Sequence, residues 1–263
     1  MKIVVMGGSG QVGAAVVARL ASRGHEVIAA SRRTGVDVIT GAGLSEILDG
    51  AEVVIDVTNS PSFEEEVAGP FFATSTARLL EAEAQAGVGR HIALSIVGAE
   101  RLHANGYFRA KLAQEQQVRA SGAPFTILRA TQFFEFLGAI VNSSLQGDQV
   151  HLAPARIQPV AAADVAAALA DLALARPADA VLELAGPDPF HLDQIARTFM
   201  AATGDRRQVV ADPQALYFGT LLSDETLMAG STPRFGHTDF DAWLRGWVRD
   251  HPPAGPESNP DQG

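Results

Sequence analysis

Short apolar runs alternate with longer amphipathic segments over the first 130 residues. Brief β-branched runs are typical of buried strands, and apolar residues repeating every three to four positions indicate helices. The expected strands are Lys2–Met6, Glu26–Ala30, Glu52–Val57, Arg90–Leu94 and Pro124–Arg129, with one more squeezed between Gly35 and Thr40. The expected helices are Gln11–Ser22, Leu44–Leu48, Phe71–Ala86 and Asn105–Ala120. Strands alternating with helices predict a parallel sheet in an α/β fold.

The pattern loosens beyond Ala130. Helices are expected over 132–144, 163–175 and 192–202, with a strand over 181–184 and mixed short elements over 205–250. We therefore expect a Rossmann-type doubly wound domain over residues 1–160, followed by a smaller mixed substrate-capping region over 161–250 that packs partly into the first domain. The last segment, 251–263, has four prolines and almost no apolar residues, which predicts a disordered tail.

Composition narrows the class of protein. The formal net charge of −10 argues against a nucleic-acid partner, because such proteins usually carry a basic face. The absence of cysteine excludes disulfides and thiolate chemistry, and the seven histidines lack metal-ligand spacing, so we expect no metal site. The apolar runs are too short for a membrane span or a secretory signal, so the sequence predicts a soluble cytoplasmic protein, a monomer or homodimer, with a small-molecule substrate.

A glycine-rich loop follows the first expected strand and opens the first helix. Gly7, Gly10 and Gly13 have the spacing Gly-x-x-Gly-x-x-Gly. In such a loop, glycines permit a tight turn, close approach of a pyrophosphate and close packing of helix on strand. The backbone of Ser9, Gln11 and Val12 would face the anion at the helix N-terminus. This placement predicts a dinucleotide site.

The end of the second strand usually distinguishes the two nicotinamide dinucleotides. An acidic residue there binds the ribose 2′-hydroxyl of NAD, whereas arginine accommodates the 2′-phosphate of NADP. This chain has Ser31, Arg32 and Arg33 at that point. A hydroxyl with two guanidinium groups forms an anion site, so we predict NADP as the cofactor, with NAD as the alternative.

A serine, a tyrosine and a lysine form the candidate catalytic set. Tyr107 and Lys111 are four residues apart on an expected helix and therefore share one face. A nearby ammonium is expected to lower the pKa of the phenol, which would help Tyr107 act as an acid or base. Ser95, at the carboxyl end of an expected strand, is expected to hold a substrate carbonyl oxygen. A tyrosine packed on a lysine stem at the surface is the alternative explanation.

Together, the glycine loop, Ser95 and the Tyr107-x-x-x-Lys111 pair resemble the short-chain dehydrogenase/reductase superfamily. The stretches 56–60, 93–98, 126–133 and 159–165 resemble its atypical, NmrA-like NAD(P)H-binding branch. The resemblance implies that Lys111 bonds the nicotinamide ribose. It further implies that the cofactor's middle portion is lined by Thr58, Asn59 and Ser60, and that the nicotinamide is flanked by Ala130, Thr131 and Phe133.

The first expectation is an NADP-dependent oxidoreductase that transfers hydride to or from a carbonyl or conjugated double bond, with Tyr107 as acid or base. An NmrA-like regulatory protein that senses the dinucleotide without turnover is the main alternative. A sugar-nucleotide epimerase or dehydratase is a further alternative, disfavoured because about 100 residues after Ala163 leave little room for a nucleotide-sugar domain. Phe133, Phe134 and Phe136 are expected either to floor a pocket beside the nicotinamide or to pack in the core.

Overall fold

The computed structural model describes residues 1–177 and 179–252. At its centre lies a seven-stranded sheet of order β14-β9-β5-β4-β3-β1-β2, in which every neighbouring pair is parallel. Its strands are β1 (Lys2–Met6), β2 (Glu26–Ala30), β3 (Val53–Asp56), β4 (Arg90–Ile96), β5 (Phe125–Ala130), β9 (Ala180–Ala185) and β14 (Arg234–Phe235). The α/β, Rossmann-type fold predicted from the sequence is confirmed.

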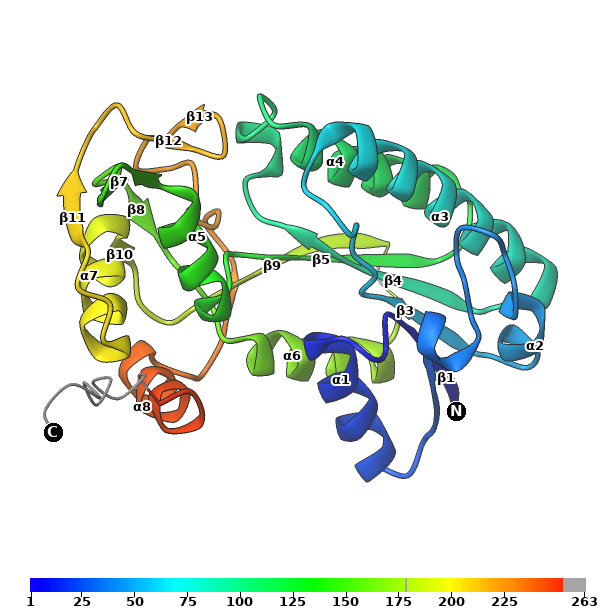
Figure 1. Cartoon of the computed structure of the whole chain (residues 1–263). Coiled ribbons are helices and arrows are strands. Elements are labelled where there is room, and N and C mark those ends of the chain that lie inside the picture. Colours follow the sequence, from blue (N-terminus) through cyan, green and yellow to red (C-terminus); the bar gives the residue numbers. More distant parts are fainter. Residues whose placement is uncertain (178, 253–263) are drawn as a thin grey trace, which may run out of the picture.

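Helices cover both faces of the sheet (Figure 1). On one face lie α1 (Gln11–Ser22) and α6 (Ala162–Leu174), which pack against each other. On the other lie α3 (Glu65–Ala86) and α4 (Gly106–Ala120), with α2 (Leu44–Leu48) beside α3. Because both faces are covered, the central strands are apolar throughout, as Val4 and Val5 illustrate: both are fully buried, in clusters on opposite faces.

Strand order reverses at β1, and this reversal positions the site. From β1 the chain runs to β2 on one side, then crosses back to β3 on the other. In open α/β sheets, ligands bind where the order reverses, outside the carboxyl ends of the strands. The glycine loop (7–13) follows β1 and residues 57–60 follow β3, so both segments border this crevice.

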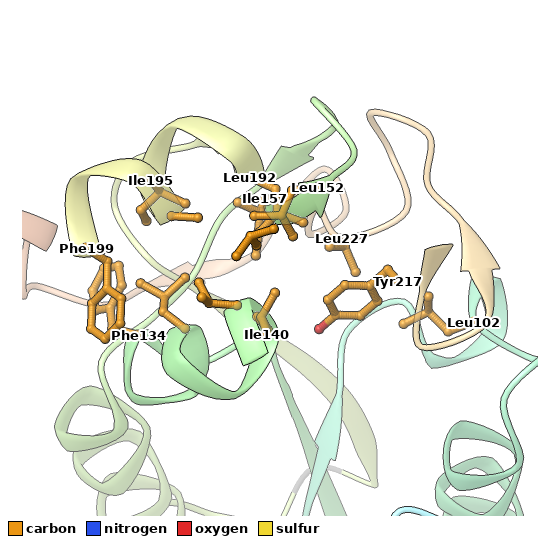
Figure 2. Close-up of a cluster of buried hydrophobic side chains, with 14 of the residues drawn as sticks. Leu102, Phe134, Ile140, Leu152, Ile157, Leu192, Ile195, Phe199, Tyr217 and Leu227 are labelled. Carbon is orange, nitrogen blue, oxygen red and sulfur yellow. The ribbon is translucent and has the colours of Figure 1, made fainter. Parts of the chain in front are cut away.

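A smaller lobe stands beyond the carboxyl ends of β5 and β9 (Figure 1). Its elements are the 3₁₀ turn η3 (Phe134–Phe136), α5 (Leu137–Ser143), β6 (Leu145–Gln146), β7 (Gln149–Leu152), β8 (Arg156–Ile157), β10 (Phe190–His191), α7 (Leu192–Thr203), β11 (Gln208–Ala211), β12 (Leu216–Tyr217), β13 (Thr220–Leu221) and α8 (Phe240–Asp250). Their side chains form one apolar cluster, and Figure 2 shows Tyr217 and Leu227 of this lobe beside Leu102, which precedes α4. The cluster therefore ties the lobe to the start of α4. The helix α6 and the strand β9, both within the expected capping region, pack into the layers of the central sheet.

The prediction of a strand between Gly35 and Thr40 is wrong. After the 3₁₀ turn η1 (Arg32–Thr34), the chain turns, because Gly35 has a φ of 82° and the Asp37 carboxylate accepts hydrogen bonds from the backbone of Ile39 and Thr40. Side-chain bonds of this kind replace the partners that a strand would need. As a result, β2 is the edge of the sheet.

Two predicted helices have different bounds. The helix that was expected to begin at Phe71 begins at Glu65, so Pro70 lies inside it, in its second turn. The segment expected to be helical from Gln132 is first extended, since the Gln132 carbonyl accepts from Val160, and it becomes α-helical only at Leu137. A second 3₁₀ turn, η2 (Ala99–Arg101), precedes α4. Of the expected tail, residues 253–263 lie outside the described residues. No helix among the described residues is long and apolar enough to cross a membrane.

Candidate active site

The loop after β1 has a shape that only glycine permits at several positions, Gly7 and Gly13 among them. Gly7 has a φ of 78°, and a Cβ placed on it would lie 2.8 Å from the Val57 carbonyl oxygen. A Cβ on Gly13 would overlap the carbonyl of Gly7, so the first turn of α1 packs directly on the loop. The two glycines therefore bring the loops after β1 and β3 and the start of α1 into close contact.

The N-terminus of α1 is open to a ligand. Its N-cap, Gly10, is exposed and provides no side-chain hydrogen bond, and the first turn has no acidic residue. The first-turn residues Gln11, Val12 and Gly13 line a cavity. Unpaired backbone N–H groups and the positive end of the helix dipole favour an anion there. The loop thus fits the pyrophosphate of a dinucleotide.

Residues that follow β2 contact the glycine loop at Ser9. The Ser9 and Ser31 hydroxyls lie 2.6 Å apart, and the Arg33 guanidinium donates to the Ser9 carbonyl at 2.9 Å. Arg32 is exposed, and its side chain makes no hydrogen bond or ion pair within the described part of the chain. Arg33 therefore holds the loop, while Arg32 is the guanidinium left available for a phosphate.

One cavity of about 330 Å³ extends from the glycine loop to the start of α4. Most of the predicted site residues line it: Gly7, Gly10, Gln11, Val12, Gly13, Thr58, Asn59, Ser95, Tyr107, Lys111, Ala130, Thr131 and Phe133. Five do not: Ser9, Ser31, Arg32, Arg33 and Ser60. The structure thus brings the candidate catalytic set and the glycine loop to one cavity.

Tyr107 is held in the first turn of α4. The Asn105 side chain caps this helix by accepting from the Tyr107 backbone N–H at 2.8 Å. The Tyr107 hydroxyl donates to Asn59 Oδ1, also at 2.8 Å. Burial raises the pKa of Tyr107 to about 12, against the lowering effect of the bond to Asn59. The phenol is therefore fully protonated near neutral pH.

Lys111 is buried and engaged away from the phenol. Its ammonium donates to the Leu94 carbonyl at 2.9 Å and to the Gln114 side chain, which in turn donates to Asp56 at 3.0 Å. Burial lowers the pKa of Lys111 to about 8, although the charges of Asp56 and Glu115 act in the opposite direction. The expectation that Lys111 lowers the pKa of Tyr107 is wrong for this structure, because the burial of the phenol dominates.

Ser95 lies within β4, one residue before its end, and not after it as expected. Its hydroxyl is buried and faces Glu115 without a hydrogen bond of good geometry. Glu115 is bound instead by Arg129, at 2.8 Å. Among the described residues, no hydrogen bond joins Ser95 to Tyr107 or Lys111.

Aromatic side chains form the other end of the cavity. Phe133 and Phe136 line it, whereas Phe134 is fully buried in the apolar cluster of the lobe (Figure 2). Phe63 and Phe218, which were not among the predicted site residues, also line the cavity. No local signal marks them, because they come from the loop before α3 and from the β12–β13 hairpin. Asn105 was also missed, although an asparagine immediately before a helix is a typical N-cap.

Two buried groups at the end of β5 lack partners. The Thr131 hydroxyl and the Gln132 side-chain amide make no hydrogen bond among the described residues, and both residues line the cavity. An unpaired buried polar group costs about 1–3 kcal/mol. A ligand with hydrogen-bonding groups would therefore fit beside β5, where the nicotinamide is expected.

A protein-family model described as NAD(P)H-binding matches residues 7–176, more than half of the chain. The chain belongs to the NAD(P)H-binding family. The match begins at the glycine loop and ends after α6, so it covers every element that lines the cavity except the β12–β13 hairpin. Membership of this family supports the dinucleotide site that the loop geometry indicates. No curated protein matches this NAD(P)H-binding chain.

Solved structures share the fold at low identity. MoeE5 in complex with UDP-glucose and NAD is 20% identical with a TM-score of 0.73, covering 95% of this chain and 99% of that one. A short-chain dehydrogenase/reductase superfamily protein from Agrobacterium tumefaciens with bound NAD is 21% identical with a TM-score of 0.69, covering 95% and 96%. A dTDP-4-dehydrorhamnose reductase from Bacillus anthracis in complex with NADP is 12% identical with a TM-score of 0.65, covering 94% and 96%. The predicted resemblance to the short-chain dehydrogenase/reductase superfamily is confirmed for the fold.

Proposed function

We propose that this protein is an NADP-dependent oxidoreductase that reduces a carbonyl or conjugated double bond of a small molecule, with Tyr107 as the proton donor. One observation carries the proposal: the Tyr107 hydroxyl lies in the same cavity as the glycine loop. The NmrA-like assignment and the cytoplasmic location remain predictions from the sequence.

Different residues of the chain would bind different parts of the cofactor. The open N-terminus of α1 would bind the pyrophosphate, and Arg32 with Ser31 would bind the 2′-phosphate. Thr58, Asn59 and Ser60 would border the middle portion. Residues 130–133 would flank the nicotinamide, where the unpaired groups of Thr131 and Gln132 stand. When bound, NADPH supplies the hydride.

The protonated phenol of Tyr107 suits the step in which a substrate oxygen gains a proton. With its pKa raised to about 12, Tyr107 is protonated near neutral pH, which is the form that can donate a proton to a substrate oxygen. Lys111, whose ammonium is bonded to Leu94 and Gln114, is retained as the proposed partner of the nicotinamide ribose and not as a group that tunes the phenol. Ser95 is retained as the proposed partner of the substrate oxygen, which requires its hydroxyl to rotate from Glu115 toward the cavity.

A dinucleotide-sensing protein without turnover is the second candidate. It is favoured by the fact that, among the described residues, neither Lys111 nor Ser95 is hydrogen-bonded to Tyr107. Two measurements distinguish the sensor from the oxidoreductase. The first is titration of NADPH, and the second is an assay of NADPH consumption across aldehydes, ketones, quinones and dyes. Saturable binding with consumption supports the oxidoreductase, whereas saturable binding without consumption of NADPH on any compound supports the sensor.

A further inference from the structure

Three phenylalanines from separate segments form one side of the cavity, which we call the aromatic wall: Phe63, Phe136 and Phe218. Their ring centroids lie 5.8 Å apart for Phe63 and Phe136, 6.0 Å for Phe136 and Phe218, and 6.4 Å for Phe63 and Phe218. Phe63 also lies edge-on to Tyr107, with a centroid distance of 4.7 Å. The wall therefore borders the proposed proton donor directly.

Phe218 is held in place by its backbone. It has a φ of 45°, a left-handed conformation that costs a bulky residue energy, and it occupies the two-residue turn between β12 and β13 with Gly219. Its carbonyl accepts from the Asn105 side chain at 3.1 Å. The neighbouring Tyr217 is buried in the lobe's apolar cluster, where Figure 2 shows it near Leu227 and Ile140. The hairpin is thus anchored on both sides, and Asn105 links it to the helix turn that carries Tyr107.

Phe63 is an exposed part of the wall. It is 44% exposed although two other rings lie within 6 Å of it. A ligand covering this ring would remove apolar surface from water, which is favourable in proportion to the area covered. The binding of an aromatic ligand is further stabilised by edge-to-face or offset contacts between its ring and the rings of the wall.

The lining of the cavity fits an uncharged substrate better than a highly charged one. Among the described residues that line it, Lys111 is the one charged side chain, and its ammonium is already bound to Leu94 and Gln114. A sugar nucleotide carries two phosphate charges, which proteins usually match with arginine, lysine or free backbone N–H groups. The free N–H groups here, at the start of α1, are those assigned to the cofactor. The aromatic end offers no match for a diphosphate.

We infer that the substrate is a flat, uncharged aryl aldehyde or ketone whose ring packs on the aromatic wall while its carbonyl oxygen accepts a hydrogen bond from Tyr107. The inference rests on the proposed function. In the reaction, the C=O π bond breaks, a new C–H bond forms with the hydride of NADPH, and the oxygen takes the proton of Tyr107. NADPH becomes NADP⁺, the aryl carbonyl becomes an alcohol, and the phenolate regains a proton from solvent.

The test compares benzaldehyde with cyclohexanecarbaldehyde, which has a ring of similar size without π electrons. Steady-state kinetics are measured for wild type, Phe63→Ala and Phe136→Leu, with Phe235→Ala as a matched control because Phe235 is 53% exposed on β14 and lies outside the cavity. We expect the KM for benzaldehyde to rise about three- to tenfold in both wall variants. The KM for cyclohexanecarbaldehyde, whose ring loses only the apolar contact, should rise by a clearly smaller factor, and Phe235→Ala should match wild type. Equal changes for the two aldehydes would overturn the inference.

Binding measurements separate this inference from the proposed function. Calorimetric titrations of benzamide, cyclohexanecarboxamide and UDP-glucose into the NADP⁺-saturated protein require no turnover. Benzamide binding more tightly than the other two, and more weakly to Phe63→Ala, supports the aromatic site even if no NADPH is consumed on any carbonyl, in which case the proposed function fails alone. UDP-glucose binding more tightly than benzamide contradicts the aromatic site, whatever the outcome for turnover.

Discussion

Asn59 Oδ1 accepts a hydrogen bond of 2.8 Å from the Tyr107 hydroxyl, so the loop after β3 fixes the phenol that α4 presents to the cavity. The two residues are 48 positions apart in the chain. Asn59 lies on the segment expected to border the cofactor, and Tyr107 lies in the candidate catalytic set. One hydrogen bond therefore couples the proposed cofactor site to the proposed proton donor.

Replacing Asn59 should impair turnover without unfolding the protein. In Asn59→Ala the phenol loses its acceptor, its orientation loosens and its pKa rises further, because the bond to Asn59 lowers that pKa in the wild type. We expect kcat to fall about ten- to a hundredfold, measured as NADPH oxidation at saturating substrate. Since Asn59 is exposed, thermal stability should stay close to wild type. Asn142→Ala, another exposed asparagine, on α5, is the matched control; an unchanged kcat in Asn59→Ala would contradict the coupling.

Arg32 should determine the preference for NADPH over NADH. Its guanidinium is exposed and makes no bond to other described residues, and a bond to a charged phosphate contributes about 1.5–3 kcal/mol. Arg32→Ala should therefore weaken NADPH binding about ten- to a hundredfold while leaving NADH binding within twofold. Fluorescence titration of both cofactors measures this. Arg156→Ala, an exposed arginine on β8, should change neither dissociation constant, and equal losses for both cofactors in Arg32→Ala would remove the assigned role.

Lys111 should make stability depend on pH in the alkaline range. Its pKa is lowered to about 8 in the folded chain, mainly by burial, against about 10.4 in an unfolded chain. Between these values the unfolded state binds more protons, so the free energy of unfolding contributed by this group rises with pH across that window. The difference between wild type and Lys111→Met should change by about 2–3 kcal/mol in favour of wild type from pH 7.5 to pH 10.5.

Urea unfolding at several pH values measures that difference. Lys2→Met, at the start of β1, is the control because Lys2 is the other lysine of the chain, and its pH profile should follow wild type. A constant difference between wild type and Lys111→Met across the window would show that the ammonium is not held in the buried position described.

Local patterns predicted the sheet but not its edge. The β-branched runs predicted most of the strands, because a strand buried on both faces leaves a continuous apolar signal, and the Gly7–Gly13 loop predicted the dinucleotide site. The segment 35–40 contains apolar residues too, yet the Asp37 side chain and the positive φ of Gly35 turn the chain there. The helix expected from Phe71 likewise begins earlier, at Glu65, with Pro70 inside it.

Within the site, helical spacing placed Tyr107 and Lys111 together but could not show what else each contacts. Lys111 is held by Gln114 on its own helix and by the carbonyl of Leu94 on β4. The long-range partners of the site, Asn59 for Tyr107 and Phe218 for Asn105, depend on how loops from distant segments meet. Such contacts leave no periodic signal in the sequence, so only the folded chain reveals them.

The Tyr107→Phe variant tests the central claim most directly, because it removes one hydroxyl while the ring keeps its contacts with Phe63 and Phe72. NADPH binding by fluorescence titration and NADPH oxidation with the best aldehyde or ketone substrate should be measured on the same preparations. The account predicts a dissociation constant for NADPH within about twofold of wild type and a kcat/KM at least about a hundredfold lower. Full turnover by Tyr107→Phe would contradict the assignment of Tyr107 as the proton donor.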